Sequence, residues 1–422
     1  MDFYIVKGGN KLNGTVTISG AKNAALPIIV ASLLAEGTTV LHNVPNLKDI
    51  QTILQVIECL GAQYQFDTNT NTLTIHVNSL KNAEVPYDLV KTMRASIYVM
   101  GPLLARCGEA DVSLPGGCAI GERPVDIHLS GFEALGTAIT IEHGYIKARV
   151  KKLNGNRFIM RKVSVGATAN IMMAAVLADG QTILENCAME PDVVDLGDFL
   201  ITMGAKIEGL GTERIIINGV KKLKPVSYSI IPDRIEAGTF LIAGAITRGN
   251  VTVNNVIPEH CKACIETLAD MGFVISGNDS SVTIEPSKKL QGSMVRTLPY
   301  PGFPTDLQAP IMSLMCTIPG ISVIIETIFE NRYTHVGELR RMGADIEIEG
   351  NTAIIKGGKQ LQAAPVLMSD LRAGASLVLA ALAARGKTEI RRIYHTDRGY
   401  ENFEQKLQAL GADIVRVKGG KP

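Results

Sequence analysis

The sequence shows no marked excess of charge of either sign. Its 42 lysines and arginines nearly balance 41 aspartates and glutamates, which leaves a formal net charge of +1. Proteins that bind nucleic acid or an acidic membrane surface favour a clear basic excess, so neither class is indicated. Any anion site is therefore expected to be local, built from a few cations brought together.

Long apolar segments are missing as well. The longest apolar stretches, 24–35 and 373–384, fall short of the roughly 20 residues that a membrane-spanning helix needs. No charged segment followed by an apolar one opens the sequence, so we expect no secretory signal. Both apolar stretches are interpreted as buried helices.

Disulfide and metal-binding patterns are equally scarce. The seven cysteines are odd in number and scattered, which favours reduced thiols and a cytoplasmic location. His260 and Cys264 resemble half of a metal site, but no second pair follows at ligand spacing. We therefore expect neither a metal nor a cofactor. The length of 422 residues predicts two or three domains.

Two series of glycines, each with a period of about 70 residues, indicate internal repeats. One follows a leucine or methionine at the end of a helix: Gly61, Gly136, Gly204, Gly272, Gly343 and Gly411. The other leads into a β-branched strand: Gly37, Gly108, Gly180, Gly249, Gly320 and Gly386. A residue that follows a helix commonly adopts a left-handed conformation, which costs glycine least. The pattern predicts six α/β units, each containing helix, strand, helix, strand and strand.

Six such units are too many to share one hydrophobic core, so we predict two domains of three units each. The polar stretch 221–228 suggests the boundary. One domain would comprise residues 22–229, and the other residues 1–21 and 230–422. The opening segment 3–19 would supply strands that complete the sixth unit, and two linkers crossing at one place would form a hinge.

The first helix of each unit begins with an unusual set of residues. A structural helix start favours Ser, Thr, Asp or Asn as its cap and an acidic first turn, yet four of the six units carry a cation. Neighbouring carboxylates could pair with these cations, as Asp370 with Arg372. For the set as a whole, an anion-binding cleft is favoured, because helix N–H groups and cations together hold phosphate and carboxylate. The residues are Lys22, Arg94, Ser164, Arg234, Asp306 and Arg372.

The segment 114–128 departs most from the repeat. It is rich in glycine and carries Cys118, with Arg123 five residues later. A structural cysteine is normally buried among apolar residues, whereas a thiol between glycines and close to a cation is exposed and can have a low pKa. We predict a reactive thiol on a loop that moves as a lid.

Six segments resemble a known family, the enolpyruvyl transferases. They are GAKNAALP (20–27), PGGCAIGERPVDIH (115–128), KVSVGAT (162–168), FPTD (303–306), ETIFENR (326–332) and HTDRGY (395–400). The resemblance covers the whole chain and implies the EPSP synthase-like fold, an inside-out α/β barrel. In this fold, two similar domains of three βαβαββ repeats each enclose the active site between them.

The resemblance is strongest to the branch that opens peptidoglycan synthesis, and hence cell-wall formation and cell division. It implies transfer of the enolpyruvyl group of phosphoenolpyruvate to the 3′-hydroxyl of UDP-N-acetylglucosamine, with release of phosphate. Cys118 would be the general acid and could add covalently to phosphoenolpyruvate, and Asp306 would be the base. A thiol at 118 also implies alkylation by epoxide inhibitors such as fosfomycin.

By the same resemblance, cations and polar groups hold the two substrates. Phosphoenolpyruvate would contact Lys22, Asn23, Arg123 and Arg398, of which Lys22 and Arg398 would also act in catalysis. The nucleotide sugar would contact Asn23, Arg94, Arg123, Pro124, Val125, Asp126, Ile127, Lys162, Val163, Ser164, Val165, Asp306 and Ile328. Arg332, Asp370 and Arg372 would support the site.

Three alternatives remain open at this stage. The sister branch uses shikimate 3-phosphate as acceptor and shares the fold, the donor and an aspartate base, but the loop with Cys118 is typical of the nucleotide-sugar branch. A ring of repeats could clamp nucleic acid, although such a clamp should be strongly basic inside. A regulatory paralogue would be expected to have lost part of the motif set. The oligomeric state is not indicated.

Overall fold

The computed structural model describes residues 1–81, 83–90, 93–114 and 125–419. Cys118, Arg123 and Pro124 therefore lie outside the described residues. Contacts divide the chain into two compact units. We call residues 20–114 and 125–231 the central unit, and residues 1–19 and 232–419 the terminal unit. Within the described residues, no helix combines the length and apolar character needed to cross a bilayer.

The strands of the described residues form six four-stranded sheets that share one pattern. The first strand is parallel to the second, and the second and fourth both run antiparallel to the third. In spatial order, the sheets of the central unit are β14 (Ser227–Ser229), β3 (Gly37–His42), β5 (Thr72–Val77), β4 (Gln63–Asp67); β6 (Glu84–Val85), β7 (Glu109–Ser113), β9 (Tyr145–Arg149), β8 (Ala138–Glu142); and β10 (Arg157–Ile159), β11 (Gln181–Glu185), β13 (Arg214–Asn218), β12 (Lys206–Glu208).

The terminal unit repeats the pattern three more times. Its sheets are β2 (Asn13–Thr17), β15 (Asn250–Asn254), β17 (Ser281–Glu285), β16 (Val274–Asn278); β18 (Met294–Arg296), β19 (Gly320–Ile325), β21 (Thr352–Gly357), β20 (Asp345–Glu349); and β22 (Val366–Leu367), β23 (Lys387–Arg391), β1 (Phe3–Lys7), β24 (Asp413–Val417). Each sheet belongs to one of the six predicted units, so the predicted βαβαββ repeat and the α/β fold class are confirmed.

Each repeat contributes two helices. The first helices are α1 (Lys22–Ala31), α4 (Met100–Cys107) preceded by η2 (Arg94–Val99), α6 (Val165–Ala175), α8 (Arg234–Ile246), α10 (Gln308–Thr317) preceded by η4 (Thr305–Leu307), and α12 (Leu371–Ala383). The second helices are α2 (Lys48–Cys59), α5 (Asp126–Ala134), α7 (Pro191–Thr202), α9 (Lys262–Asp270), α11 (Val336–Arg341) and α13 (Phe403–Ala409). A short extra helix, α3 (Tyr87–Val90), precedes η2.

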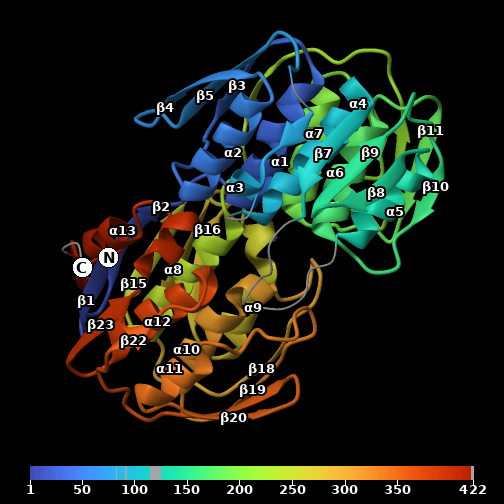
Figure 1. Cartoon of the computed structure of the whole chain (residues 1–422). Helices are drawn as coiled ribbons and strands as arrows, with labels where there is room; N and C mark the ends of the chain where they lie inside the picture. The colour runs from blue at the N-terminus through green and yellow to red at the C-terminus, as the bar shows by residue number, and fades with distance from the viewer. Residues whose placement is uncertain (82, 91–92, 115–124, 420–422) are drawn as a thin grey trace. The chain divides into compact units, whose positions relative to one another are not determined.

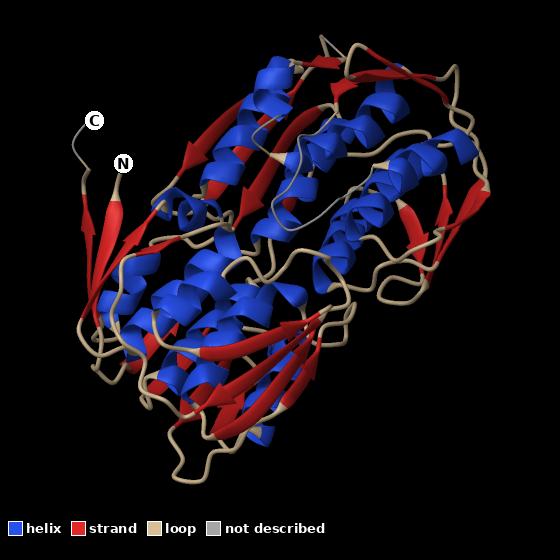
Figure 2. Ribbon diagram, turned by 60° about the horizontal axis from the view of Figure 1, so that its bottom comes forward, coloured by secondary structure: helices blue, strands red, loops and turns tan. Residues whose placement is uncertain are grey.

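The first helices form the interior of each unit, and the sheets lie outside them (Figures 1 and 2). In the terminal unit, α8, α10 and α12 pack against one another, and every residue of α12 from 372 to 382 is buried. A helix that is apolar all round is stable only when it is enclosed on all sides. Between α10 and α12, the hydroxyls of Ser313 and Ser376 lie 2.7 Å apart, which satisfies both polar groups inside this core.

The opening strands enter two different sheets of the terminal unit. As the repeat register predicts, β1 completes the sixth sheet, where it lies between β23 and β24. The sequence did not indicate that β2 would pair with β15 in the fourth sheet. In the central unit, β14 completes the first sheet beside β3. The division by contacts falls at 19/20 and 231/232, two residues from each predicted boundary. The hinge itself stays a prediction.

The glycine series behave as predicted, with one exception. All six helix-ending glycines and five strand-leading ones have positive φ. Gly249 is the exception, because Arg248 takes the left-handed conformation instead, with φ 55°. Gly249 is required for a different reason: a Cβ there would lie 1.8 Å from the carbonyl oxygen of Leu12. The prediction of left-handed backbone was therefore wrong at this position, where close approach of two chain segments excludes a side chain.

We expect Gly343→Ala and Gly337→Ala to change stability in opposite directions. No atom lies within 4 Å of a Cβ at either position, but Gly343 has φ 89° and Gly337 lies in helix α11. The first substitution should lower the free energy of unfolding by about 1–2 kcal/mol through backbone strain. The second should raise it by about 0.5–1 kcal/mol. Chemical denaturation measures both, and equal effects would contradict the assignment.

Candidate functional site

The six residues predicted at the helix starts all lie there. Lys22 and Arg234 are the first residues of α1 and α8, and Arg94 begins η2. Ser164 is the N-cap of α6, Asp306 lies in η4, and Arg372 is the second residue of α12. At the starts of α1, η2 and η4, the side chain of the cap residue accepts no hydrogen bond from the helix backbone. These three starts therefore lack the usual side-chain acceptor for helix N–H groups.

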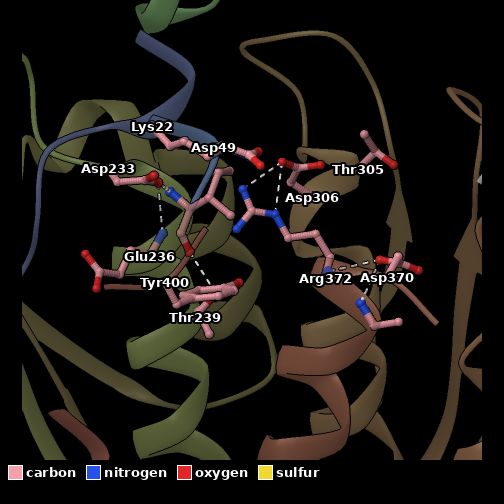
Figure 3. Close-up of polar contacts among 12 residues, drawn as sticks. Lys22, Asp49, Asp233, Glu236, Thr239, Thr305, Asp306, Asp370, Arg372 and Tyr400 are labelled. Carbon is pink, nitrogen blue, oxygen red and sulfur yellow. Dashed lines mark hydrogen bonds and ion pairs between the residues drawn. The ribbon is translucent and has the colours of Figure 1, made fainter. Parts of the chain in front are cut away.

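In the terminal unit, Asp306 lies between two buried guanidinium groups. Nη2 of Arg332 donates to Oδ1 of Asp306 at 2.9 Å. Nε and Nη2 of Arg372 donate to Oδ2 at 3.1 and 2.9 Å (Figure 3). Each arginine side chain is 4% exposed, whereas that of Asp306 is 28% exposed. The carboxylate is therefore fixed in orientation by charge-assisted hydrogen bonds and still open on one side.

Arg372 is positioned by its own helix and by an aromatic ring. Oδ1 of Asp370 accepts hydrogen bonds from the backbone N–H groups of Arg372 and Ala373, at 2.9 and 3.0 Å (Figure 3). The guanidinium lies over the ring of Tyr400, 5.2 Å from its centroid. Burial alone would lower the pKa of Arg372, but Asp306 and Tyr400 raise it above its ordinary value. The cation remains charged although it is buried.

Arg372 pairs with a carboxylate, but this carboxylate is not that of the neighbouring Asp370. The sequence suggested Asp370 as the carboxylate that could pair with Arg372. Oδ1 of Asp370 accepts from the backbone N–H of Arg372, and the guanidinium reaches Asp306, which is 66 residues away in sequence. The ion pair thus joins two repeats and does not merely neutralise a helix end. Asp233 caps α8 in the same way, accepting from Ile235 and Glu236.

Arg332 ends a segment that follows strand β19. Besides Asp306, its Nη2 contacts the carbonyl oxygen of Thr305 at 3.3 Å. The guanidinium also lies 5.6 Å from the centroid of the Phe329 ring. Ile328, predicted to contact the nucleotide sugar, lies in the same segment and is half-buried. The structure therefore brings the 326–332 motif and the 303–306 motif together within the terminal unit.

Arg398 ends η5 (Ile393–Arg398) and is half-buried. Its neighbour Asp397 receives two hydrogen bonds of 2.9 Å from the guanidinium of Arg416, on strand β24. This bidentate pair fixes the short helix at its end. Burial, and then the charge of Arg398, lower the pKa of His395, so this histidine is neutral near pH 7.

In the central unit, Lys22 is paired with a carboxylate. Nζ of Lys22 lies 3.4 Å from Oδ2 of Asp49 on α2, and both side chains are nearly buried (Figure 3). Asn23 is the next residue of α1 and is partly exposed. A second buried group, His128 on α5, has its Nδ1 3.1 Å from Nδ2 of Asn170. Burial, and then Arg94, lower the pKa of His128 to about 3.

The other described residues that are predicted to contact the nucleotide sugar lie at two helix starts. The hydroxyl oxygen of Ser164 accepts from the N–H of Ala167, at 3.2 Å, and α6 begins at Val165. Lys162 is exposed and Val163 is half-buried just before this helix. At the start of α5, Val125 is buried, Ile127 is half-buried, and Asp126 forms an ion pair with Arg161. The contacts of these residues with the nucleotide sugar stay predictions.

The buried cysteines of the described residues are unsuited to nucleophilic chemistry. Burial raises the pKa of Cys187, Cys261 and Cys316 to about 12 and raises that of Cys264 further. A thiol with a raised pKa carries almost no thiolate at neutral pH. The described residues also contain no cluster of three His, Cys, Asp or Glu side chains able to hold a metal ion.

Sequence reasoning missed three residues that support the site. Asp49 pairs with Lys22, Tyr400 lies under Arg372, and Glu326 binds the segment around Ile328. Tyr400 and Glu326 are part of the quoted motifs but received no role. Asp49 had no signal beyond being an acidic residue in the first turn of α2, where it equally suits the helix dipole.

Known proteins resemble this chain over its whole length. The family model described as EPSP synthase (3-phosphoshikimate 1-carboxyvinyltransferase) matches residues 6–407. A protein of Geobacter metallireducens named UDP-N-acetylglucosamine 1-carboxyvinyltransferase is 54% identical over 418 residues, covering 99% of this chain and 100% of that protein. A protein of Myxococcus xanthus with the same name is 52% identical over 419 residues, with the same coverage.

Solved structures agree with these similarities. The enolpyruvyl transferase NikO of Streptomyces tendae has a TM-score of 0.89 at 25% identity, covering 99% of both chains. EPSP synthase of Acinetobacter baumannii has a TM-score of 0.77 at 19% identity, covering 99% of this chain and 100% of that one, and shares the fold. The resemblance predicted from the sequence is confirmed: the chain belongs to the EPSP synthase family of enolpyruvyl transferases.

Proposed function

We propose that the protein transfers the enolpyruvyl group of phosphoenolpyruvate to the 3′-hydroxyl of UDP-N-acetylglucosamine and releases phosphate. The relatives that are more than half identical over their whole length carry the name of this activity. The observation that carries the proposal is the environment of Asp306, a partly exposed carboxylate fixed by two buried arginines at the position of the family's base. We further propose that the reaction serves peptidoglycan synthesis in the cytoplasm.

The chemistry requires a base that accepts the proton of the sugar hydroxyl. A carboxylate used in this way must face the substrate in one orientation, because proton transfer depends on distance and direction. Arg332 and Arg372 engage one oxygen each from the protein side. The exposed edge of Asp306 is then the part available to the acceptor hydroxyl.

The donor carries a phosphate and a carboxylate, so it requires several cations. Guanidinium and ammonium groups hold such anions through charge-assisted hydrogen bonds. We assign this role to Lys22, Arg123 and Arg398, with Asn23 beside them. Cys118, as general acid, would protonate the C3 methylene, which makes C2 electrophilic and able to accept the sugar oxygen. A base of the site then removes a proton from the C3 methyl group as the phosphate leaves, and the enol double bond forms again.

The acceptor distinguishes this proposal from the sister activity. With phosphoenolpyruvate present, UDP-N-acetylglucosamine should drive release of inorganic phosphate, and shikimate 3-phosphate should not. Phosphate release is measured with each acceptor separately, using the same protein sample. Turnover with shikimate 3-phosphate alone would assign the chain to the other branch, and no turnover with either would reject both activities.

Asp306→Asn should abolish most turnover while leaving nucleotide-sugar binding measurable. An amide cannot accept the hydroxyl proton, and loss of a general base commonly costs about 10²- to 10⁴-fold in rate. Calorimetric titration with UDP-N-acetylglucosamine, beside a phosphate-release assay, separates the two effects. Asp345→Asn is the matched control, because Asp345 pairs with Lys359 on the surface of the same unit. Turnover retained within about threefold would contradict the base assignment.

Substitutions of Cys118 should separate alkylation from activity. Cys118→Ser should lose both alkylation by fosfomycin and most turnover near neutral pH, whereas Cys118→Asp should stay active and resist the inhibitor. An aspartic acid can still deliver a proton, but it is not alkylated in place of a thiolate. Cys107→Ser is the control, because Cys107 is an exposed cysteine elsewhere in the chain. Protection of this control from fosfomycin would contradict the assignment.

A further inference from the structure

One position of the repeat follows the second strand of each sheet, six residues after the strand-leading glycine. In three repeats this position holds an asparagine with a left-handed backbone: Asn43, Asn186 and Asn255. Each asparagine donates its Nδ2 to the carbonyl that follows the first strand of its sheet, at 2.9, 2.8 and 2.7 Å. A neutral amide therefore ties the first strand to the second at this point in the fold.

The fifth repeat has Glu326 at this position instead, and it lacks the left-handed backbone. The tie between strands is still present, because the next residue supplies it. Thr327 donates its backbone N–H to the hydroxyl of Thr297 at 2.9 Å, and its own hydroxyl donates to the carbonyl of Thr297. Thr297 follows β18, the first strand of this sheet. The fold therefore does not require a carboxylate here.

The carboxylate of Glu326 does not bind the first strand as the asparagines do. The residue is only 3% exposed, so the carboxylate needs hydrogen-bond donors from the protein. Oε1 accepts hydrogen bonds from the backbone N–H groups of Ile328 and Phe329, at 2.8 and 3.1 Å. Oε2 accepts from the hydroxyl of Thr305 at 2.9 Å. Burying a carboxylate costs more than burying an amide, and these three donors offset that cost.

These contacts join the two segments that carry proposed functional residues. Thr305 directly precedes Asp306, and its carbonyl also accepts from Arg332. Glu326 and Arg332, which are the two ends of the 326–332 segment, thus both bind Thr305 at the start of η4. On the other side, Glu326 fixes the backbone of Ile328. One buried side chain therefore connects the position of the base with the position of the predicted sugar contact.

We propose that Glu326 is a positioning residue for enolpyruvyl transfer, acting through Thr305 on Asp306 and through two backbone N–H groups on Ile328. The inference rests on the proposed function and adds a residue whose role is not contact with substrate. We call the contact of Glu326 with Thr305 the first arm and its contacts with the backbone of Ile328 and Phe329 the second arm. The first arm governs turnover, and the second arm governs affinity for the nucleotide sugar.

Substitutions that cut the arms separately test this proposal. Thr305→Val removes only the first arm and should lower kcat roughly tenfold or more, with KM for UDP-N-acetylglucosamine within about twofold, because small displacements of a base are costly. Glu326→Ala removes both arms and should lower kcat and raise KM. Glu326→Gln should restore kcat to within about threefold of the unchanged protein, since its amide can accept from the backbone and donate to Thr305.

Steady-state kinetics, with active protein counted by calorimetric titration of the nucleotide sugar, provide the readout. Thr283→Val is the matched control: it removes a hydroxyl that lies 2.8 Å from that of Thr252 in a distant sheet of the same unit, and its kinetics should not change. If Glu326→Ala does not fold, Thr305→Val and the conservative Thr305→Ser decide the question.

The outcomes are distinct. Thr305→Val with unchanged kcat, or with a raised KM and no loss of kcat, would overturn the inference. If a variant loses activity only in proportion to its loss of folded protein, kcat per active site is unchanged. This result would also overturn the inference. An unchanged protein that releases no phosphate with either acceptor would instead reject the proposed function.

Discussion

The carboxylate of Asp306 shared by two buried guanidinium groups is the interaction on which the site in the terminal unit depends. It joins η4, the segment after β19 and the start of α12, which come from two different repeats. Removing one partner of a buried ion pair commonly costs about 3–5 kcal/mol, because the other charge stays buried. These arginines can remain in the protein interior because Asp306 accepts from both, and Asp306 keeps its orientation because both arginines are rigidly packed.

The repeat explains why such a site can form in this fold. Three apolar helices pack side by side within each unit, so their starts are set by the same scaffold, and polar residues there do not disturb the core. The fold is maintained by features that recur among the repeats: the glycines, which all six share, and the asparagine after the second strand, which three share. Residues of the proposed site occur where a repeat departs from others, as Asp306 does among mainly cationic helix starts and Glu326 does where three repeats have asparagine.

Much of the fold could be predicted from the sequence, because periodic glycines mark where each helix ends and each strand begins. The helix-start residues were found in the same way, by counting within the repeat. Pairing of β2 with β15 was not predicted, since the contact joins segments more than 230 residues apart and leaves no local signal. The partner of Arg372 was also missed: an adjacent Asp370 looked sufficient, but helix geometry directs that carboxylate to the backbone. A role such as the one proposed for Glu326 depends on the direction of the side chain, which spacing alone does not give.

The place of β1 has a consequence for how the protein is made. This strand lies between β23 and β24, so it is translated long before either of its partners. The central unit, by contrast, consists of residues that all precede β23 in the sequence, and it can fold while β1 is still unpaired. A chain truncated before β23 would expose an open strand edge, which is a feature that favours aggregation. Completion of the sixth sheet therefore waits until β24 has been translated.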